Sequence, residues 1–144
     1  MISQRAKYAL RALVALVEAR AGEPLMISEI SRRKAIPKKF LEQILLELKR
    51  SGMVESRRGR LGGYVLARPA EKITFGEVLR LIDGPIALLP CLSKIAYRRC
   101  ADCADEQSCE IRHVFARVAE ATRDVLDTTT LADAVKLPGE LLQA

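Results

Sequence analysis

The chain has 144 residues, of which 49% are hydrophobic and 4% aromatic, and its net charge is +6. This length suits one compact domain, or one small domain with an appendage. No run of about 18 apolar residues occurs, so no membrane span is predicted. The N-terminal stretch carries charged residues throughout and lacks the apolar core of a signal peptide, so we expect a cytoplasmic protein.

The positive charge is concentrated in the first half of the chain. Residues 1–66 hold 14 Lys/Arg and 6 Asp/Glu, a balance of +8, whereas residues 67–144 hold 10 and 12, a balance of −2. Neutralisation of phosphates dominates the affinity of proteins for DNA, so this asymmetry favours a nucleic-acid partner for the first half. The alternative is a generally basic surface.

The first predicted helix covers residues 3–20, with Ser3 as its cap and Gly22 and Pro24 after its end. Its apolar residues recur every three or four positions and so predict a core-facing stripe. They are Ala6, Ala9, Leu10, Leu13, Val14, Leu16 and Val17.

A helix-turn-helix is predicted next, over residues 28–34 and 37–50. Ser28 is the expected cap of its first helix, and Pro37 suits the first position of its second helix, where the missing N–H costs nothing. The predicted buried stripe of the second helix is Phe40, Leu41, Ile44, Leu45 and Leu48.

The opposite face of this second helix carries the candidate base contacts near its N-terminus. These residues are Lys38, Lys39, Glu42 and Gln43. A recognition helix contacts bases and phosphates from this position. Gln can read adenine, Glu can accept a hydrogen bond from cytosine, and Lys can reach guanine or phosphate. The alternative is a solvated helix face without a partner.

A β-hairpin is predicted over residues 53–67, with strands at 53–57 and 63–67. Its loop is rich in glycine, which permits the positive φ values of a tight turn, and carries three arginines. The loop residues concerned are Arg57, Arg58, Gly59, Arg60, Gly62 and Gly63. Such a wing can lie against phosphates or enter the minor groove, where Arg is favoured. A phosphate-binding loop is excluded because no GxxxxGK[ST] pattern is present.

Two further helices are predicted in the second half. Thr74 and Glu77 form a capping box for a helix that ends at Gly84, and a long helix covers residues 110–127. The long helix has an apolar stripe of Ile111, Val114, Phe115, Val118, Thr122, Val125 and Leu126. Little chain remains to cover this stripe, so we expect it to pack against the first helix and a second subunit. A short capped helix is expected near residues 130–133, and the tail after Pro138 carries no prediction.

All four cysteines fall within nineteen residues, with the spacing C-x8-C-x2-C-x5-C. They are Cys91, Cys100, Cys103 and Cys109, and His113 is an additional candidate ligand. Thiolates suit iron–sulfur clusters and zinc. The residues leave four interpretations open: an iron–sulfur cluster, a zinc site, thiol–disulfide redox sensing, or cysteines without a ligand. In the first and third cases the segment could alter the spacing of two DNA-reading units.

Residues 36–84 resemble the bacterial winged helix-turn-helix regulators related to IscR, NsrR and CymR (the Rrf2 type). The most specific parts are Phe40-Leu41-Glu42-Gln43 with Leu48, and the wing from Arg57 to Tyr64. The opening KYALRALVALV and the cysteines behind the fourth helix fit as well, so that the resemblance covers nearly the whole chain.

The resemblance implies a homodimeric DNA-binding regulator, often a repressor, and some members sense iron–sulfur status, nitric oxide or redox state through a cluster. In those members three cysteines follow a pattern near C-x5–7-C-x5-C. Here Cys103 and Cys109 match the second half of the pattern. Cys91 corresponds to the first cysteine, but the gap between Cys91 and Cys103 is longer than in the pattern, and Cys100 is an additional cysteine. Other members lack cysteines and still bind DNA.

We therefore predict a mainly α protein, a winged helix-turn-helix with a two-stranded β-wing and a long C-terminal dimerisation helix. Three parts are expected: a DNA-binding domain (1–84), a cysteine-containing sensor segment (85–109), and a dimerisation helix with a tail (110–144). The expected partners are double-stranded DNA and a second copy of the chain. The predicted DNA-binding residues are Ser28, Pro37, Lys38, Lys39, Glu42, Gln43, Arg57, Arg58, Arg60, Gly62, Gly63 and Tyr64. The alternatives are a redox or metal-handling protein and a cofactor-free regulator that responds to a small molecule. No enzyme is expected, since the sequence has one His and no Ser/His/Asp set or nucleotide fingerprint.

Overall fold

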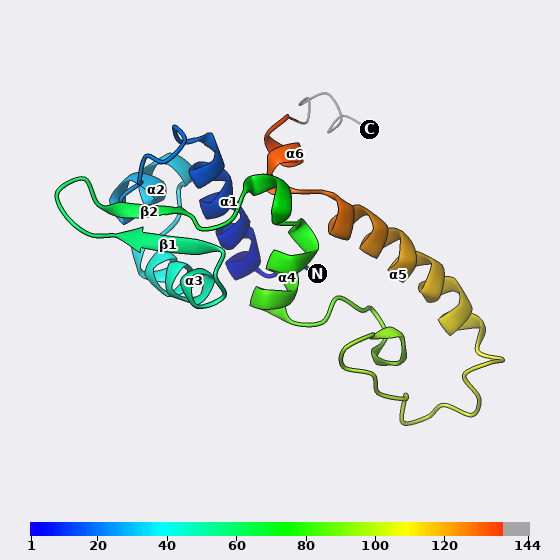
Figure 1. Cartoon of the computed structure of the whole chain (residues 1–144). Coiled ribbons are helices and arrows are strands. Elements are labelled where there is room, and N and C mark those ends of the chain that lie inside the picture. Colours follow the sequence, from blue (N-terminus) through cyan, green and yellow to red (C-terminus); the bar gives the residue numbers. More distant parts are fainter. Residues whose placement is uncertain (137–144) are drawn as a thin grey trace.

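The computed structural model describes residues 1–136, in which helices dominate and a two-stranded sheet projects to one side (Figure 1). The first half comprises α1 (Gln4–Glu18), α2 (Ile27–Lys34), α3 (Lys38–Arg50), β1 (Val54–Arg57) and β2 (Gly63–Leu66). The second half comprises η1 (Ala70–Lys72), α4 (Phe75–Asp83), η2 (Pro90–Leu92), α5 (Glu110–Thr128) and α6 (Leu131–Lys136). The predicted fold class is confirmed for its mainly α composition, its two-stranded wing and the long helix of the second half.

The core lies between α1 and the helices around it, which are α2, α3, α4 and α6. The buried face of α1 is rich in alanine, and small side chains let neighbouring helices approach closely. Its buried residues are Ala6, Ala9, Ala12, Leu13, Ala15 and Leu16. Larger apolar side chains from the other elements fill the remaining space. We call this unit, made of α1–α4, β1, β2 and α6, the head.

The turn between α2 and α3 is tight and well bonded. Ala35 ends α2 with a left-handed φ of 51°, and the hydroxyl of Ser31 donates to the carbonyl of Ile36 over 2.6 Å. The predicted cap was wrong, because α2 begins at Ile27 with Met26 as its N-cap and leaves Ser28 exposed within the first turn. Pro37 is the N-cap of α3 rather than its first residue.

The stripe predicted for α3 was right for four residues and wrong for Phe40. Leu41, Ile44, Leu45 and Leu48 are fully buried, whereas the side chain of Phe40 is 53% exposed. Phe40 lies in the first turn of α3, where its ring meets Tyr8 of α1 with the ring centroids 6.2 Å apart. It therefore covers the edge of the core without entering it.

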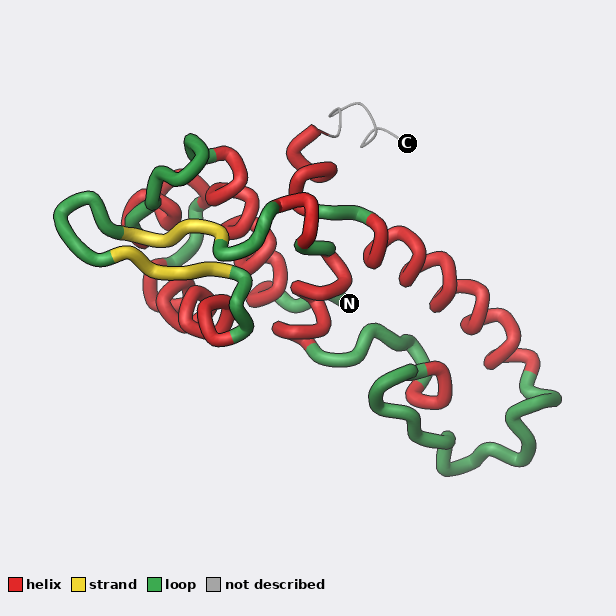
Figure 2. Tube along the Cα trace, in the orientation of Figure 1, coloured by secondary structure: helices red, strands yellow, loops and turns green. Residues whose placement is uncertain are grey.

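The two strands form an antiparallel hairpin in which Val54 pairs with Leu66 and Arg57 with Gly63 (Figure 2). The loop before α2 pairs with β2 through one antiparallel β-bridge, because Leu25 and Tyr64 exchange backbone hydrogen bonds of 3.0 and 2.8 Å. The hairpin is thus tied to the head at its base, while its loop extends beyond the helices.

The long helix α5 leaves the head and packs on α4 and η2. The expectation that α5 would pack against α1 was wrong, because α5 packs mainly on α4 and η2, while α1 packs on α2, α3, α4 and α6. The chain then returns to the head, where the amide of Leu131 donates to the carbonyl of Ile73 over 2.9 Å. No helix among residues 1–136 is long and apolar enough to cross a membrane.

The caps predicted in the second half are partly confirmed. The Thr74 hydroxyl accepts from the amide of Glu77 over 3.2 Å, but the Glu77 carboxylate pairs with Arg68 instead of completing the box. At α6 the box is complete, because Thr130 and Asp133 cap each other's amides. The tail after Pro138 lies outside the described residues.

Candidate nucleic-acid interface

A groove of about 480 Å³ separates the N-terminal end of α3 from the hairpin. Residues from the start of α2, from α3, from both strands and from the loop between the strands line it. They are Met26, Ile27, Ser28, Lys38, Glu42, Ser56, Arg57, Gly59, Arg60, Gly62, Gly63 and Tyr64. The groove thus joins the two elements that the sequence had indicated separately, the candidate recognition helix and the wing.

Eight of the twelve predicted DNA-binding residues line this groove. They are Ser28, Lys38, Glu42, Arg57, Arg60, Gly62, Gly63 and Tyr64. Pro37, Lys39, Gln43 and Arg58 are exposed beside it and do not line it. Four lining residues were not among the predicted contacts, namely Met26, Ile27, Ser56 and Gly59. The positions of Met26 and Ser56 depend on the pairing of Leu25 with Tyr64 and on the strand register.

Four cations at this surface have no carboxylate partner in the described part of the chain. Lys38, Lys39, Arg58 and Arg60 are exposed and make no ion pair within residues 1–136. Arg57 is more constrained, since its guanidinium lies 3.5 Å from both the Glu55 carboxylate and the Gly22 carbonyl. The free cations are those that phosphates could neutralise without the loss of an existing ion pair.

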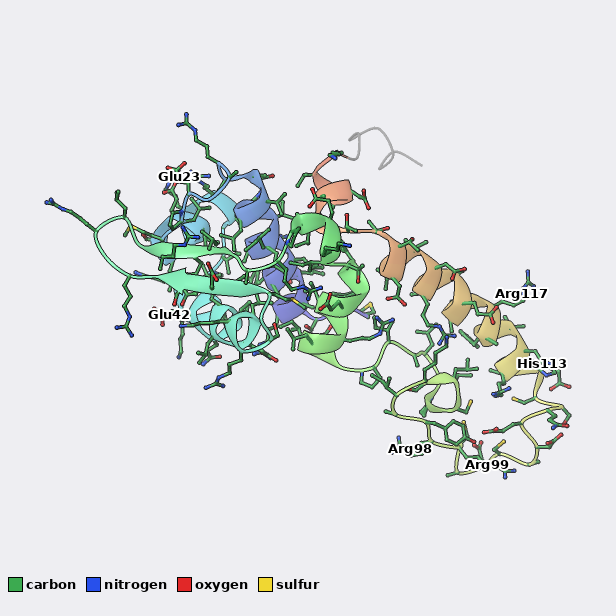
Figure 3. The ribbon with its side chains drawn as sticks, viewed as in Figure 1. Glu23, Glu42, Arg98, Arg99, His113 and Arg117 are labelled. Atoms are coloured by element: carbon green, nitrogen blue, oxygen red, sulfur yellow. The ribbon has the colours of Figure 1, made fainter. Side chains whose placement is uncertain are left out.

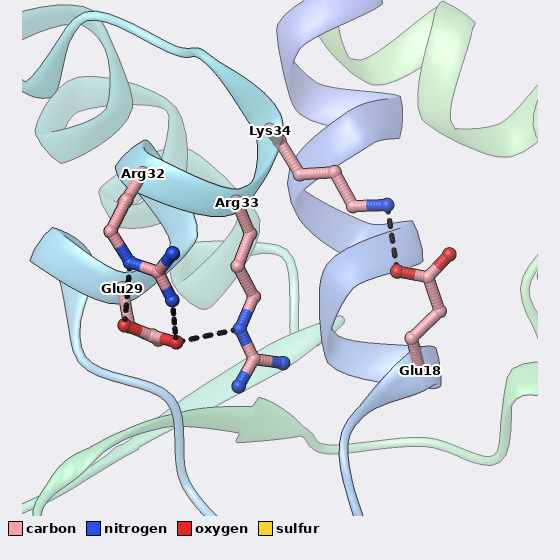
Figure 4. A network of polar contacts seen from close by, with 5 residues as sticks. All are labelled: Glu18, Glu29, Arg32, Arg33 and Lys34. Atoms are coloured by element: carbon pink, nitrogen blue, oxygen red, sulfur yellow. Dashed lines mark hydrogen bonds and ion pairs between the residues drawn. The ribbon is translucent and has the colours of Figure 1, made fainter.

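The cations of α2 are already paired (Figure 4). Glu29 accepts from both Arg32 and Arg33 over 2.7 Å, and Lys34 meets Glu18 of α1 at 2.7 Å. The hydrogen bond from Arg32, followed by that from Arg33, holds the pKa of Glu29 below its ordinary value. This network leaves α2 as a supporting helix and concentrates uncompensated charge on α3 and the wing.

The shape of the wing depends on two glycines. A Cβ on Gly62 would lie 2.4 Å from the Arg57 carbonyl oxygen, and a Cβ on Gly63 would lie 2.4 Å from the Leu25 carbonyl oxygen. Gly63 also has a φ of 148°, which disfavours other residues. On the other side of the hairpin, Lys49 at the end of α3 donates to the Ser56 hydroxyl over 2.7 Å. The wing is therefore held against both α3 and the loop before α2.

The cysteine segment lies at the opposite end of the molecule, where Figure 3 labels Arg98, Arg99 and His113 far from Glu42. It has little regular secondary structure and is held by side chains. Tyr97 donates to Glu106 over 2.6 Å, and Arg99 donates to the carbonyls of Cys103 and Ala104 over 3.2 and 3.0 Å. The segment is therefore a folded loop.

The four thiols differ in environment. Cys91 is buried in η2, and Cys100 and Cys103 are half-buried. Burial, followed by the neighbouring Cys91, raises the pKa of Cys100. Cys109 caps α5, its sulfur accepting from the amide of Arg112 over 3.4 Å. His113 is exposed on the first turn of α5.

These residues do not fit a preformed metal cage. Within residues 1–136 no three His, Cys, Asp or Glu side chains are grouped so that they could hold a metal ion. All four cysteines are free thiols, and the Cys109 sulfur accepts one backbone N–H as a helix cap, which a metal-bound thiolate can also do. The predicted ligand set of Cys91, Cys100, Cys103 and Cys109 thus lies in one loop without converging on one point.

Comparison with known proteins assigns the family. Residues 2–137 match the family Rrf2, described as iron-dependent transcriptional regulators. The chain belongs to the Rrf2 family. It is therefore a transcriptional regulator and not an enzyme, as the sequence had indicated.

Individual Rrf2 relatives agree with this assignment. An rrf2-like HTH-type transcriptional regulator of Rhodobacter capsulatus is 51% identical over 136 residues, covering 92% of this chain and 91% of the relative. The solved structure of CymR, titled the global cysteine regulator of Bacillus subtilis, has a TM-score of 0.79 at 29% identity and covers 94% of this chain and 96% of CymR. The solved structure of T. potens IscR has a TM-score of 0.75 at 26% identity and covers 100% of this chain and 92% of that IscR chain.

Proposed function

We propose that this Rrf2 regulator binds double-stranded DNA, with the N-terminal end of α3 in the major groove and the β1–β2 wing against the adjacent phosphates and minor groove. The observation that carries the proposal is the groove in which Lys38 and Glu42 of α3 face Arg57 and Arg60 of the wing. A helix beside a basic hairpin can contact one face of a duplex at two places, so that base contacts and phosphate contacts support each other.

A salt titration tests this proposal. Arg58→Ala and Arg60→Ala should weaken binding to all duplexes and reduce the slope of log affinity against log salt by about one for each phosphate contact removed. Arg98→Ala is the matched control, because Arg98 is an exposed arginine at the opposite end of the molecule. Unchanged affinity and slope in both wing variants would overturn the assignment.

We further propose that the regulator acts as a homodimer along α5 and represses transcription by occupying two half-sites. Five exposed side chains support the dimer, namely Ile111, Val114, Val118, Ala121 and Val125. They follow one another at alternating steps of three and four, which is the heptad spacing of a coiled-coil seam. Ala121 and Val125 also line an apolar groove of about 610 Å³ between α5 and residues 79–88. A second α5 would cover both surfaces, and a two-fold dimer matches paired half-sites.

The third part of the proposal is that residues 85–109 receive the signal, between a DNA-binding part at 1–84 and a dimerisation part at 110–144. The iron dependence of the family supports an input based on iron. The resemblance to regulators that sense redox state or nitric oxide makes these the other candidate signals. Because the thiols do not converge, ligation of an iron–sulfur cluster or zinc would require the segment to rearrange. The other candidate is a cofactor-free regulator.

Anaerobic purification separates these inputs. Iron, acid-labile sulfide and visible absorption would support a cluster, whereas zinc alone would support a structural site. A colourless, metal-free protein with full DNA affinity would leave thiol chemistry or a cofactor-free signal. The variant with all four cysteines changed to Ser should keep the DNA-binding groove, because the thiols lie far from it, but its DNA affinity should no longer respond to oxidation or to iron removal. An unaltered response in this folded variant would contradict a signal received by the thiols.

A further inference from the structure

Leu61 occupies an unusual place for an apolar side chain. It lies in the loop of the wing and is 88% exposed. Isolated exposed apolar residues are common on protein surfaces, so exposure alone carries no conclusion. Its location does, because the loop that bears Leu61 projects beyond the helices of the head (Figure 1). In the proposed complex the wing tip lies against the duplex.

The turn that presents Leu61 is constrained on both sides. The amide of Gly62 donates to the carbonyl of Gly59 over 3.0 Å. The backbone of Gly62 lies so close to Arg57 that a Cβ would clash with its carbonyl oxygen. Beyond it, Tyr64 is bonded to Leu25. A preformed turn lowers the entropic cost of placing the leucine in a binding site.

The charges around Leu61 define the surface that it would meet. Arg58 and Arg60 are exposed on the same loop and make no ion pair within residues 1–136. Two arginines direct the tip to phosphates, but a leucine gains nothing from a phosphate. Between the two phosphate backbones, the walls of the minor groove are formed by deoxyribose C–H groups, which are apolar. Proteins that enter this groove combine Arg with apolar side chains.

We propose that Leu61 packs between the deoxyribose walls of the minor groove while Arg58 and Arg60 hold the flanking phosphates. This inference rests on the proposed DNA-binding function and adds a specificity element to it. One leucine can contact both walls only where the groove is narrow, and A·T-rich segments have the narrower groove. Leu61 therefore favours A·T pairs beneath the wing without a hydrogen bond to any base.

The first test uses a duplex enriched by the wild-type protein from a random-sequence pool. Leu61→Ala should weaken binding about tenfold with an unchanged salt slope, because it removes apolar contact and no charge. Arg60→Ala should lower affinity and slope together. Leu61→Met keeps an apolar side chain of similar volume and should bind like the wild type. Val135→Ala, an exposed apolar change on α6, is the control.

The second test locates the contact in the minor groove. The A·T pairs under the wing are replaced by I·C or by G·C, which differ by the guanine N2 amino group in the minor groove and are alike in the major groove. The guanine amino group should lower the DNA affinity of the wild type several-fold and should hardly change the DNA affinity of Leu61→Ala. Equal costs, or full affinity in Leu61→Ala, would overturn this inference alone. Failure of the wild type to bind any duplex would overturn the proposed function itself.

Discussion

The guanidinium of Arg80 on α4 binds both carboxylate oxygens of Asp127 on α5, with Nη1–Oδ1 and Nη2–Oδ2 distances of 2.7 and 2.9 Å. Two parallel N–H···O bonds fix the relative orientation of the groups more closely than one bond can. The pair therefore contributes to the angle at which α5 leaves the head. In a dimer built along α5, this angle would determine the spacing of the two wings.

Asp127→Asn should destabilise the protein by about 0.5 kcal/mol at neutral pH, a small value because the pair is partly exposed. The hydrogen bond from Arg80 lowers the pKa of Asp127 below its ordinary 3.8. The contribution of the pair is therefore complete above pH 3.8 and is lost as the pH falls through the lowered value. Urea unfolding at neutral and acidic pH should show the difference from the wild type shrinking in acid. Asp124→Asn, one turn earlier on α5, is the control, and a pH-independent difference would contradict the prediction.

Gly76→Ala should also break the ion pair between Arg80 and Asp127, because the added methyl group would take the place of the Asp127 carboxylate. A Cβ at Gly76 would lie 2.0 Å from Asp127 Oδ1 and 3.0 Å from an Arg80 nitrogen, so the carboxylate must move away. Alanine favours the helix by up to about 1 kcal/mol, so the net stability should stay near that of the wild type. The informative quantity is the coupling in a double-mutant cycle. Asp127→Asn should have almost no effect in the Gly76→Ala background, and additive effects would show that the pair survives the substitution.

Much of the head could be predicted from the sequence because its helices have regular apolar spacing. Leu41, Ile44 and Leu48 are buried as their spacing indicated. The prediction that Phe40 is buried was wrong, because helical periodicity does not reveal where the neighbouring helix ends. Ser28 was wrong as a cap because the backbone of Met26 opens α2 without a side-chain hydrogen bond.

The candidate interface was predictable in its chemistry and less so in its shape. Basic residues on one helix face and an Arg/Gly loop indicated α3 and the wing. Their separation across one groove depends on the contact between Leu25 and Tyr64, which are 39 positions apart and carry no pairing pattern. The conformation of the cysteine loop was harder to predict, because the spacing of the cysteines does not reveal which backbone carbonyls Arg99 contacts.

Val118→Asp should dissociate the proposed dimer. A carboxylate at the centre of an apolar seam would be buried without a partner, and we expect association to weaken about 100-fold. Sedimentation velocity over a concentration series measures this, and affinity for a two-half-site duplex should fall with it. Glu120→Gln, an exposed change on the same helix outside the seam, should leave the assembly intact. A dimer that persists in Val118→Asp would place the interface elsewhere.

Cys100 should react slowly with iodoacetamide at neutral pH, because burial and then Cys91 raise its pKa above the ordinary 9.0 and leave less thiolate at any given pH. Mass spectrometry of the alkylated peptide across a pH series gives the midpoint. Cys91→Ala should move this midpoint downward but leave it above that of the urea-unfolded chain, since the burial remains. A midpoint at or below 9.0 in the folded protein would contradict the prediction. A protonated Cys100 would need a ligand, or an opening of the loop, before it acts as a thiolate.

Residues 84–109 leave the head at the end of α4 and lead back along α5 to the place where Arg80 meets Asp127. The two ends of this excursion, residues 84–109 together with α5, are thus held together at the head by contacts that do not involve the cysteines. The entropy of closing such a loop grows only with the logarithm of its length. Insertions, deletions and new ligand residues can accumulate between these anchors at little cost to the folding of the head. Closure at the base therefore lets this segment change in length and composition while the head stays the same. The proposed DNA-binding surface could in this way be combined with different proposed signals.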